Sequence, residues 1–402
     1  MLSSLMTPYH EWLVQLRRHF HRFPELAHQE EKTAAKIAEV LKDLGVPFRA
    51  GVGGTGLVAR LEGGVEGPTV AMRADMDALP LTELNAVPYR STCPGVMHAC
   101  GHDGHLTMAL GTIRMLLENG WRRDGRGNVL FFFQPAEEGG WGAKSMIETG
   151  ILESERVQAI FAPHVHPHLP AGHIGMSPDV TNAAADDFTI RLVGKGGHAA
   201  HPELCADAIV AGAFLVGQLQ TIVSRNVPPL DSTVVTIGCF QAGTASNIIP
   251  EQAVLEGTAR TLRPEIRDMV LNRLREIVAG CGEAHRVATD LALTSGYPLV
   301  VNDARLVRRV SDVAKKLLGV EGVHMELPSM GAEDFGCFLE KCPGVLIRVG
   351  SRDPEEAFRY GLHSPHFDID ERALDVGVRL FTLVLSSCGP FLEAGAGSAG
   401  GI

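Results

Sequence analysis

The chain has 402 residues, which is more than one ordinary hydrophobic core accommodates, so its length favours two domains. Hydrophobic residues make up 45% of the sequence and charged residues 21%, as in an ordinary globular protein. The net charge of -11 comes without a basic patch, so nothing in the sequence indicates a surface for nucleic acid or for an anionic membrane.

The N-terminus and the cysteines indicate the cellular compartment of the protein. Residues 1–8 lack a basic segment followed by a long apolar run, so we expect no signal peptide. We also expect no apolar stretch long enough to span a bilayer. Eight cysteines are scattered without a C-x-x-C pair, which in a chain of this length is typical of a reduced, cytosolic protein. The sequence therefore predicts a cytoplasmic protein with no membrane partner.

In the first part of the chain, helical and strand patterns alternate. The apolar spacing predicts helix within residues 11–45 and again at 106–118. Short apolar runs predict strands at residues 56–61, 69–73, 129–133 and 159–162. Short strands that alternate with helices are typical of an α/β sheet covered on both faces.

One glycine-rich motif suggests a different class of enzyme. Gly51–Gly56 matches G-x-G-x-x-G, but a dinucleotide site needs a helix that opens at the last glycine. Here the pattern predicts a short strand, so we interpret the segment as a hairpin, which argues against a dehydrogenase. The sequence also holds no H-E-x-x-H helix, no P-loop and no G-x-S-x-G motif, which removes support for zincins, NTPases and serine esterases.

The pattern changes near Asn182. Strands are predicted at residues 188–193, 233–240 and 252–261, and helices at 206–219 and 266–279. A β-α-β-β-α-β order is that of a ferredoxin-like unit. We therefore predict an α/β fold in which residues 1–181 and 295–392 form one discontinuous domain with a mostly parallel mixed sheet, residues 182–294 form an inserted ferredoxin-like α+β domain, and residues 393–402 form a disordered tail.

The strongest chemical signal lies in Met97–His105. Cys100 and His102 are two residues apart, so an extended chain would point both to one side. A thiolate and an imidazole both bind first-row metals. Asp103 could cap the following helix or orient an imidazole. The alternative is a buried free cysteine with loop histidines, which the C-x-H-D-x-H clustering disfavours.

Two adjacent carboxylates follow the predicted strand 129–133. Glu137 and Glu138 lie in Gln134–Gly140, where ligands of open α/β sheets gather. One carboxylate could bind metal while the other takes a proton from water. Read alone, the segment could equally be a solvated acidic turn.

Further histidines follow at His164 and His363, each in a short cluster of histidines. The mixed Cys, His and Glu set suits an open catalytic metal site better than a closed structural zinc site, which would more often be rich in cysteine. Asp75 and Asp77 also follow a predicted strand, and they could be metal ligands, carboxylates that orient ligands, or turn formers.

The inserted unit adds three candidates. His198 lies in a glycine-rich loop, Asn247 offers an amide, and Arg260 lies on a predicted strand. A lone histidine or asparagine of this kind is usually structural. An arginine on a half-buried strand is the stronger indication, because it needs an anionic partner.

These residues together resemble a known family, the dinuclear metal-dependent aminoacylases and carboxypeptidases. The similarity is to the subgroup of hippurate hydrolases, N-acyl-amino-acid amidohydrolases and auxin-conjugate hydrolases. It runs from Arg17–Leu26 to Leu362–Pro365, and the combination of Met97–His105, Gln134–Gly140 and Ser329–Phe335 is specific to that subgroup. The inserted unit resembles the family's lid and dimerisation domain, which implies a homodimer.

The resemblance implies a role for each candidate in the first domain. Two divalent ions are expected, with Cys100 as the bridging ligand. Glu138 and His363 resemble the ligands of one ion, and His102 and His164 those of the other. Glu137 resembles the general base, and Asp77 the carboxylate that orients a metal-bound histidine.

The remaining roles concern the substrate. The resemblance implies that His198 and Asn247 reach an active site from the lid, often that of the partner subunit. Arg260 resembles the clamp on the substrate's free carboxylate, and Gly331 part of the substrate pocket. Relatives outside the subgroup have a histidine at the position of Asp75 and an aspartate at that of Cys100, so zinc, manganese, cobalt and nickel all stay open.

The expected activity is therefore metal-dependent cleavage of N-acyl amino acids, small molecules of the hippurate or N-acetyl type. A dipeptidase or carboxypeptidase with the same machinery is the alternative within enzymes. A non-catalytic metal-binding or partner-binding protein is the alternative from another class, and the presence of Glu137 argues against it.

Overall fold

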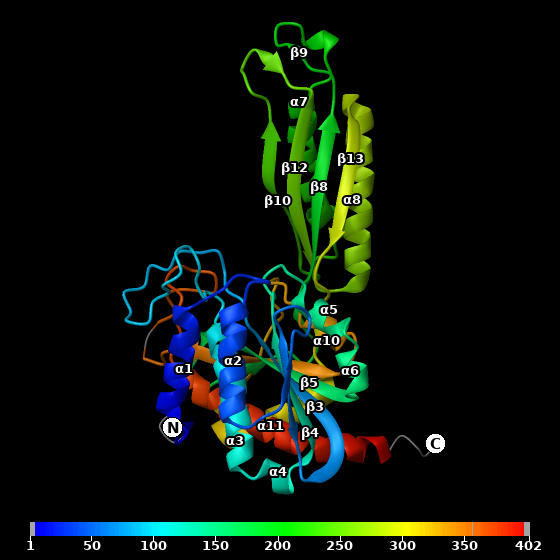
Figure 1. Ribbon diagram of the computed structural model, residues 1–402. Coiled ribbons are helices and arrows are strands. Elements are labelled where there is room, and N and C mark those ends of the chain that lie inside the picture. Colours follow the sequence, from blue (N-terminus) through cyan, green and yellow to red (C-terminus); the bar gives the residue numbers. More distant parts are fainter. Residues whose placement is uncertain (1–4, 356, 398–402) are drawn as a thin grey trace. The chain divides into compact units, whose positions relative to one another are not determined.

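The computed structural model describes residues 5–355 and 357–397 (Figure 1). The chain folds into two compact units. Unit 1 comprises residues 1–181, 301–327 and 334–402, as far as they are described, and unit 2 comprises residues 182–300 and 328–333. Unit 2 thus extends to Val300, beyond the strand that ends at Ser295, and it includes a short return of the chain at Pro328–Glu333.

Unit 1 is built on an eight-stranded sheet of order β1-β2-β4-β3-β5-β16-β6-β15. Its central pairs β4/β3, β3/β5 and β5/β16 are parallel, whereas β1/β2, β2/β4 and β16/β6 are antiparallel. The predicted mixed, mostly parallel sheet is thereby confirmed. The strands are β1 (Phe48–Ala50), β2 (Leu57–Glu62), β3 (Val65–Asp75), β4 (Arg126–Gln134), β5 (Val157–Pro170), β6 (Ile174–Met176), β15 (Val323–Met325) and β16 (Gly344–Arg352).

Helices cover both faces of this sheet. Phe131 and Phe133 point into the main core, while Phe132 points the other way and meets Phe338 of α10 with ring centroids 5.5 Å apart. Because side chains alternate along a strand, this arrangement explains why β4 is one continuous apolar run. The helices are α1 (His10–Arg22), α2 (Glu31–Asp43), α3 (His102–Glu118), α4 (Trp121–Asp124), α5 (Gly142–Ile147), α6 (Ile151–Ser154), α9 (Ala304–Leu318), α10 (Gly336–Leu339) and α11 (Arg372–Gly397).

The glycine-rich segment is a hairpin loop, as predicted. β1 and β2 pair antiparallel with Ala50 opposite Leu57, and Gly51–Gly56 connects them. A strand rather than a helix therefore follows the last glycine, and the geometry of a dinucleotide site is missing from this segment.

Unit 2 has the ferredoxin-like order. Its antiparallel sheet runs β10-β12-β8-β13, and α7 and α8 pack together on one face, where they share a core with the sheet. Figure 1 shows the four long strands beside these helices. The elements are β8 (Ala184–Val193), β9 (Gly197–His198), α7 (Ala208–Thr221), β10 (Thr233–Ala242), β11 (Ile248–Ile249), β12 (Gln252–Thr261), α8 (Pro264–His285) and β13 (Ala288–Ser295). A separate two-stranded sheet pairs β7 (Val180–Asn182) with β14 (Val300–Val301).

Two expectations need correction. Among the described residues one helical stretch, Ala208–Asn226, is long and apolar enough to cross a membrane by length and composition, although we expected no such stretch. It comprises α7 and the π-helical segment Ile222–Asn226 that follows it. Its apolar character has two sources, because Ala211, Leu215 and Leu219 fill the core of unit 2 while other apolar residues face outward.

The C-terminal end also differs from the prediction. The expected disorder from residue 393 does not hold as far as Gly397, because α11 continues to that residue. Alanine, the strongest helix former, offsets the glycines in this segment. Residues 398–402 of the predicted tail lie outside the described residues.

Candidate metal centre

The candidate ligands of unit 1 converge at one edge of its sheet. β3 ends at Asp75, and β4 ends just before the Glu137–Glu138 pair. β5 carries His164 midway along its length, level with the end of β3, because Met72 of β3 lies opposite Phe161 of β5. Parallel strands place their carboxyl ends at the same edge. The start of α3 brings Cys100 and His102 to that edge.

Short distances connect all five predicted ligands. The Sγ of Cys100, a ring nitrogen of His102 and a carboxylate oxygen of Glu138 lie within 4.8 Å of one another. The Sγ of Cys100 lies 3.7 Å from Nε2 of His164. Nε2 of His363 lies 3.2 Å from Oε1 of Glu138. The five side chains therefore form one cluster.

A tight turn, rather than an extended chain, joins Cys100 to His102. Gly101 has φ +83° and immediately precedes α3, so the expectation of an extended segment was wrong. A Cβ on Gly101 would come within 2.3 Å of the Val165 side chain. Only glycine satisfies both the left-handed backbone and this close approach.

The histidine ligands present Nε2 to the centre. The Nδ1–H of His102 donates to the carbonyl oxygen of Asp77 at 2.8 Å, and the Nδ1–H of His164 donates to the carbonyl oxygen of Val165 at 2.8 Å. Each bond places a proton on Nδ1, so the neutral ring would offer the lone pair of Nε2 to a metal, the arrangement that metal-binding histidines adopt.

Asp77 acts on this arrangement with its side chain as well. Its Oδ1 lies 3.3 Å from Nδ1 of His102, and its Oδ2 accepts the backbone N–H of Glu138 at 2.9 Å. Asp77 thereby contacts two candidate ligands. Of the three roles that the sequence left open for this residue, the geometry favours orientation of ligands.

The two adjacent glutamates both face His102. Glu137 Oε2 and Glu138 Oε1 each lie 4.0 Å from Nε2 of that ring. Ala136 has φ +51°, and its N–H donates to Oε1 of Glu30 at 2.8 Å, so a buried carboxylate supports the turn before the pair. Adjacent side chains of a regular strand point to opposite faces, so the turn is what allows Glu137 and Glu138 both to approach His102.

The electrostatics of the cluster fit a cation. Nε2 of His102 is buried and makes no hydrogen bond within the described part of the chain, while carboxylate oxygens of Asp75, Glu137 and Glu138 surround it at 3.8–4.0 Å. Burial raises the pKa of the Cys100 thiol, and the charge of Glu138 raises it further. A bound divalent ion would reverse that shift, because metal coordination stabilises a thiolate.

The other histidines respond to their neighbours in opposite ways. Hydrogen bonds with Cys100 and Glu138 raise the pKa of His363 to about 10. Burial lowers the pKa of His164, and the nearby ring of His105 lowers it further. A neutral His164 is ready to coordinate metal.

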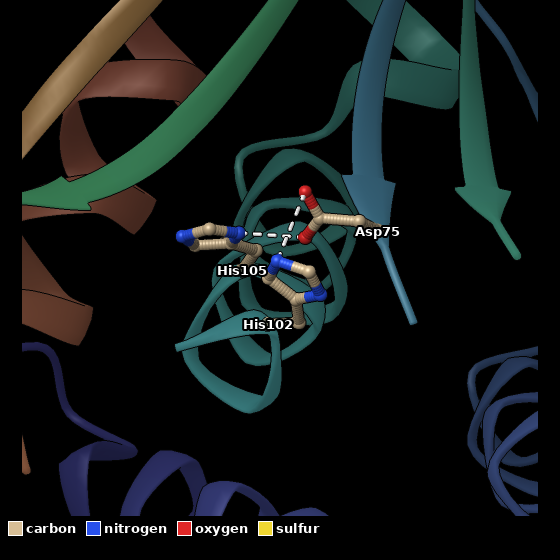
Figure 2. Close-up of side chains that lie close together, drawn as sticks. All are labelled: Asp75, His102 and His105. Carbon is tan, nitrogen blue, oxygen red and sulfur yellow. Dashed lines mark hydrogen bonds and ion pairs between the residues drawn. The ribbon is translucent and has the colours of Figure 1, made fainter. Parts of the chain in front are cut away.

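Asp75, whose role the sequence left open, is held from two sides. Nη1 of Arg73 donates to its Oδ2 at 2.6 Å. Nδ1 of His105 donates to its Oδ1 at 2.6 Å (Figure 2). His105 received no role from the sequence, although it follows His102 by three residues and therefore lies on the same face of α3.

Asp103 has the second of the two roles that we expected, since it contacts an imidazole. It lies inside the first turn of α3, where its Oδ2 accepts Nε of Arg17 at 2.7 Å and Nδ1 of His21 at 2.8 Å. It therefore orients an imidazole, but not one of the candidate ligands. The partners come from α1, so the local pattern around Asp103 did not reveal them.

The other predicted residues belong to unit 2. His198 and Asn247 lie on neighbouring segments, since β9 pairs with β11 and the N–H of Ala199 donates to the carbonyl oxygen of Asn247 at 3.1 Å. Arg260 lies on β12, with Nη1 3.9 Å from Oδ1 of Asp187. The carbonyl oxygen of Gly331 accepts Nδ2 of Asn182 at 3.2 Å.

Comparison with known proteins agrees with this description. The sequence profile of Peptidase family M20/M25/M40 matches residues 71–387. An N-acetylcysteine deacetylase of Bacillus subtilis (strain 168) is 39% identical over 378 residues, which cover 93% of this chain and 96% of that protein. An N-acetyldiaminopimelate deacetylase of Anoxybacillus flavithermus (strain DSM 21510 / WK1) is 40% identical over 370 residues, covering 92% and 95%.

A solved structure shares the fold. The crystal structure of the YXEP protein of Bacillus subtilis, described as a dinuclear metal binding peptidase, superposes with a TM-score of 0.82 at 34% identity. The match covers 95% of this chain and 99% of that one.

Proposed function

The chain belongs to Peptidase family M20/M25/M40, and we propose that it is a metal-dependent hydrolase that cleaves the amide bond of N-acyl amino acids, releasing a carboxylic acid and a free amino acid. The observation that carries this proposal is the cluster of a thiol, three imidazoles and a glutamate, with a second glutamate beside it. Such a mixed set suits an open, catalytic metal site.

The cluster would hold two divalent ions. Cys100 lies within reach of ligands from both proposed pairs, which supports it as the bridging ligand. Glu138 and His363 would complete one site, and His102 and His164 the other. Zinc, manganese, cobalt and nickel all accept this combination of donors. When bound, such ions acidify a coordinated water and polarise the amide carbonyl.

Glu137 is the proposed general base. It is largely buried beside His102, and it is not one of the five proposed ligands. It would accept a proton from the attacking water and pass that proton to the leaving amine nitrogen. One water is consumed: the new C–O bond forms first and gives a tetrahedral oxyanion, and the C–N bond breaks when the leaving nitrogen is protonated. Proton transfer of this kind typically contributes about 10²–10⁴-fold to the rate.

Unit 2 would supply the groups that recognise the substrate. Nδ1 of His198 accepts the backbone N–H of Ala200 at 3.0 Å, so the ring proton resides on Nε2, where it can donate to an oxyanion. Arg260 would bind the free carboxylate of the substrate with two parallel hydrogen bonds. Asn247 and Gly331 would contact the rest of the substrate.

We further propose a homodimer that forms through unit 2. Ile209, Val210 and Phe214 of α7 are exposed, and so is Phe240 of the edge strand β10. Phe240 lies against α7, because a Cβ on Gly212 would meet its ring at 2.5 Å. An apolar patch beside an unpaired strand edge is a surface that a second copy can cover by extending the sheet.

We also propose a cytoplasmic location. No disulfide joins the cysteines whose side chains the structure describes, as expected of a protein in a reducing compartment.

A substrate panel on metal-reconstituted protein tests the proposed function. The panel contains hippurate, N-acetyl amino acids and dipeptides with matched C-terminal residues. We expect the acyl amino acids to have the highest kcat/KM. Faster cleavage of dipeptides would favour the alternative, a dipeptidase or carboxypeptidase. No hydrolysis of any amide, with both metals bound, would point to a non-catalytic protein.

A further inference from the structure

One buried histidine lies between two of the proposed ligands without being one itself. The ring of His105 lies 5.5 Å from that of His102 and 4.9 Å from that of His164, centroid to centroid. These two ligands are the pair proposed for the same ion. His105 is fully buried, so its contacts are made within the protein.

The hydrogen bonds of His105 define its tautomer. The backbone N–H of Val165 donates to Nε2 at 2.8 Å, so Nε2 carries no proton and its lone pair is in use. The proton therefore resides on Nδ1, which donates to Oδ1 of Asp75 at 2.6 Å (Figure 2). With both nitrogens committed, His105 has no lone pair for a metal, even though it lies in a group with Asp75 and His102 that could otherwise hold one.

The anchor of this histidine is itself rigidly held. Asp75 accepts Arg73, whose other nitrogens donate to Gln134 at 2.7 Å and Asp334 at 2.8 Å. All these side chains are buried. Such a connected set of charge-assisted hydrogen bonds resists displacement, because each broken bond would leave a buried charge unpaired.

The far side of the ring acts on β5. Val165 directly follows His164, and its carbonyl oxygen accepts Nδ1–H of His164 while its N–H is bound by His105. Through its N–H, the position of Val165 thus depends on His105. Through its carbonyl oxygen, Val165 in turn orients the ring of the neighbouring candidate ligand His164.

We propose that His105 is a positioning residue of the metal centre: it binds no metal, and it sets the place of ligand His164 by linking Val165 to the anchored carboxylate of Asp75. This inference rests on the proposed ligand roles of His102 and His164. It predicts that changes at His105 weaken binding of one ion of the pair and spare the ion that Glu138 and His363 hold.

Two substitutions of His105 each remove one of its two hydrogen bonds and can keep the other. In His105→Asn the amide nitrogen replaces Nδ1, so the bond to Asp75 can persist while the bond to Val165 is lost. In His105→Gln the amide oxygen reaches the position of Nε2, so the bond to Val165 can persist while that to Asp75 is lost. His21→Gln is the matched control, since this buried histidine also bonds two partners, Asp103 and Glu83.

The measurement is a Co²⁺ titration of each metal-free protein, followed by calorimetry and by the visible absorption bands of Co²⁺. We expect His105→Asn to weaken one of two binding steps about 10- to 100-fold and to change its absorption, with a smaller effect for His105→Gln. His21→Gln should lower the thermal midpoint yet keep both steps. Two wild-type steps in His105→Asn would overturn the inference and leave the metal centre intact, whereas fewer than two steps in the wild-type protein would overturn the proposed dinuclear centre instead.

If the variants do not fold, a measurement on the wild-type protein tests the positioning role of His105. Histidine labelled with ¹⁵N reports which ring nitrogen carries the proton. We expect His105 to hold its proton on Nδ1 both before and after Zn²⁺ is added, while Nε2 of His102 and His164 shift on binding. A Zn²⁺-induced shift typical of coordination at His105 would identify it as a ligand and reject the positioning role.

Discussion

Oε1 of Glu138 lies 3.2 Å from Nε2 of His363, which the chain reaches only after it has passed through the whole of unit 2. His363 adopts a left-handed backbone with φ +62°, and its N–H donates to the carbonyl oxygen of Ala99 at 2.8 Å. The loop that carries His363 is thereby attached to the segment that carries Cys100, and the distant ligand is placed by backbone contacts.

The first prediction separates the two adjacent glutamates. Glu137→Gln should lose about 10²–10⁴-fold in kcat and still bind two metal ions, because it removes a base but no ligand. Glu138→Gln should bind less than two ions, because a neutral amide replaces a charged ligand. Metal content by atomic emission and steady-state kinetics measure both effects. Full activity of Glu137→Gln would refute its assignment as the base.

The second prediction concerns Arg260. Arg260→Ala should reduce kcat/KM for N-acyl amino acids by roughly 10- to 150-fold, the equivalent of about 1.5–3 kcal/mol for a hydrogen bond to a charged group. The corresponding amides, which lack the carboxylate, should be affected much less. Arg191→Ala, at an exposed position on β8, controls for loss of one positive charge. Equal losses on both substrate types would indicate a structural arginine.

The third prediction tests whether His198 acts across a dimer interface. Glu137→Gln and His198→Ala are prepared separately and refolded together. If His198 serves the partner's site, each heterodimer has one site with both defects and one with neither, so about a quarter of all sites should recover after random mixing. If His198 serves its own subunit, every site keeps one defect.

The control for that experiment blocks the proposed interface. Val210→Asp in both variants should prevent dimers and abolish the recovery, since it places a charge on the exposed apolar face of α7. Sedimentation velocity checks the oligomeric state. No recovery despite proven heterodimers would reject the trans arrangement while leaving the metal chemistry unaffected.

The fourth prediction addresses stability. Arg17 is fully buried and binds Asp103 and Asp368, each at 2.7 Å. Arg17→Met should lower the free energy of unfolding by about 3–5 kcal/mol, because it leaves the buried carboxylate of Asp103 and the partly buried carboxylate of Asp368 without their cation. Arg18→Met removes a partly exposed pair with Glu371 and should cost less than about 1 kcal/mol. Urea unfolding monitored by fluorescence compares the two neighbours, and equal losses would contradict the argument.

The fifth prediction concerns acid. Although burial opposes ionisation of Asp368, the charge of Arg17 and the hydrogen bond from Tyr89 hold its pKa below the ordinary value. A carboxylate with a depressed pKa in the folded state stabilises the protein above its unfolded pKa of about 3.9, and this stabilisation disappears as the pH falls through the folded pKa. The free energy of unfolding should therefore decline below about pH 4, and Asp368→Asn should flatten that decline. Asp43→Asn, at an exposed position, should not.

Local sequence patterns predicted much of the candidate site and of the fold. Ligand-type residues stood just after apolar runs, and because those runs are parallel strands, their ends meet at one edge. The strand pattern that follows Gly56 also excluded a dinucleotide-binding motif, because such a motif needs a helix at that point. These inferences succeeded because periodicity and strand order depend on neighbours along the chain.

By itself, then, the sequence determined which residue types could hold a metal and roughly where their strands and helices lie. Only the tertiary structure decided that His105 is committed to Asp75 and Val165, that Asp103 serves Arg17 and His21, and that a turn at Gly101 joins Cys100 to His102. The reason is physical: a side chain's donors and acceptors are assigned by whichever groups the fold brings within about 3 Å, and most of those groups are distant in sequence.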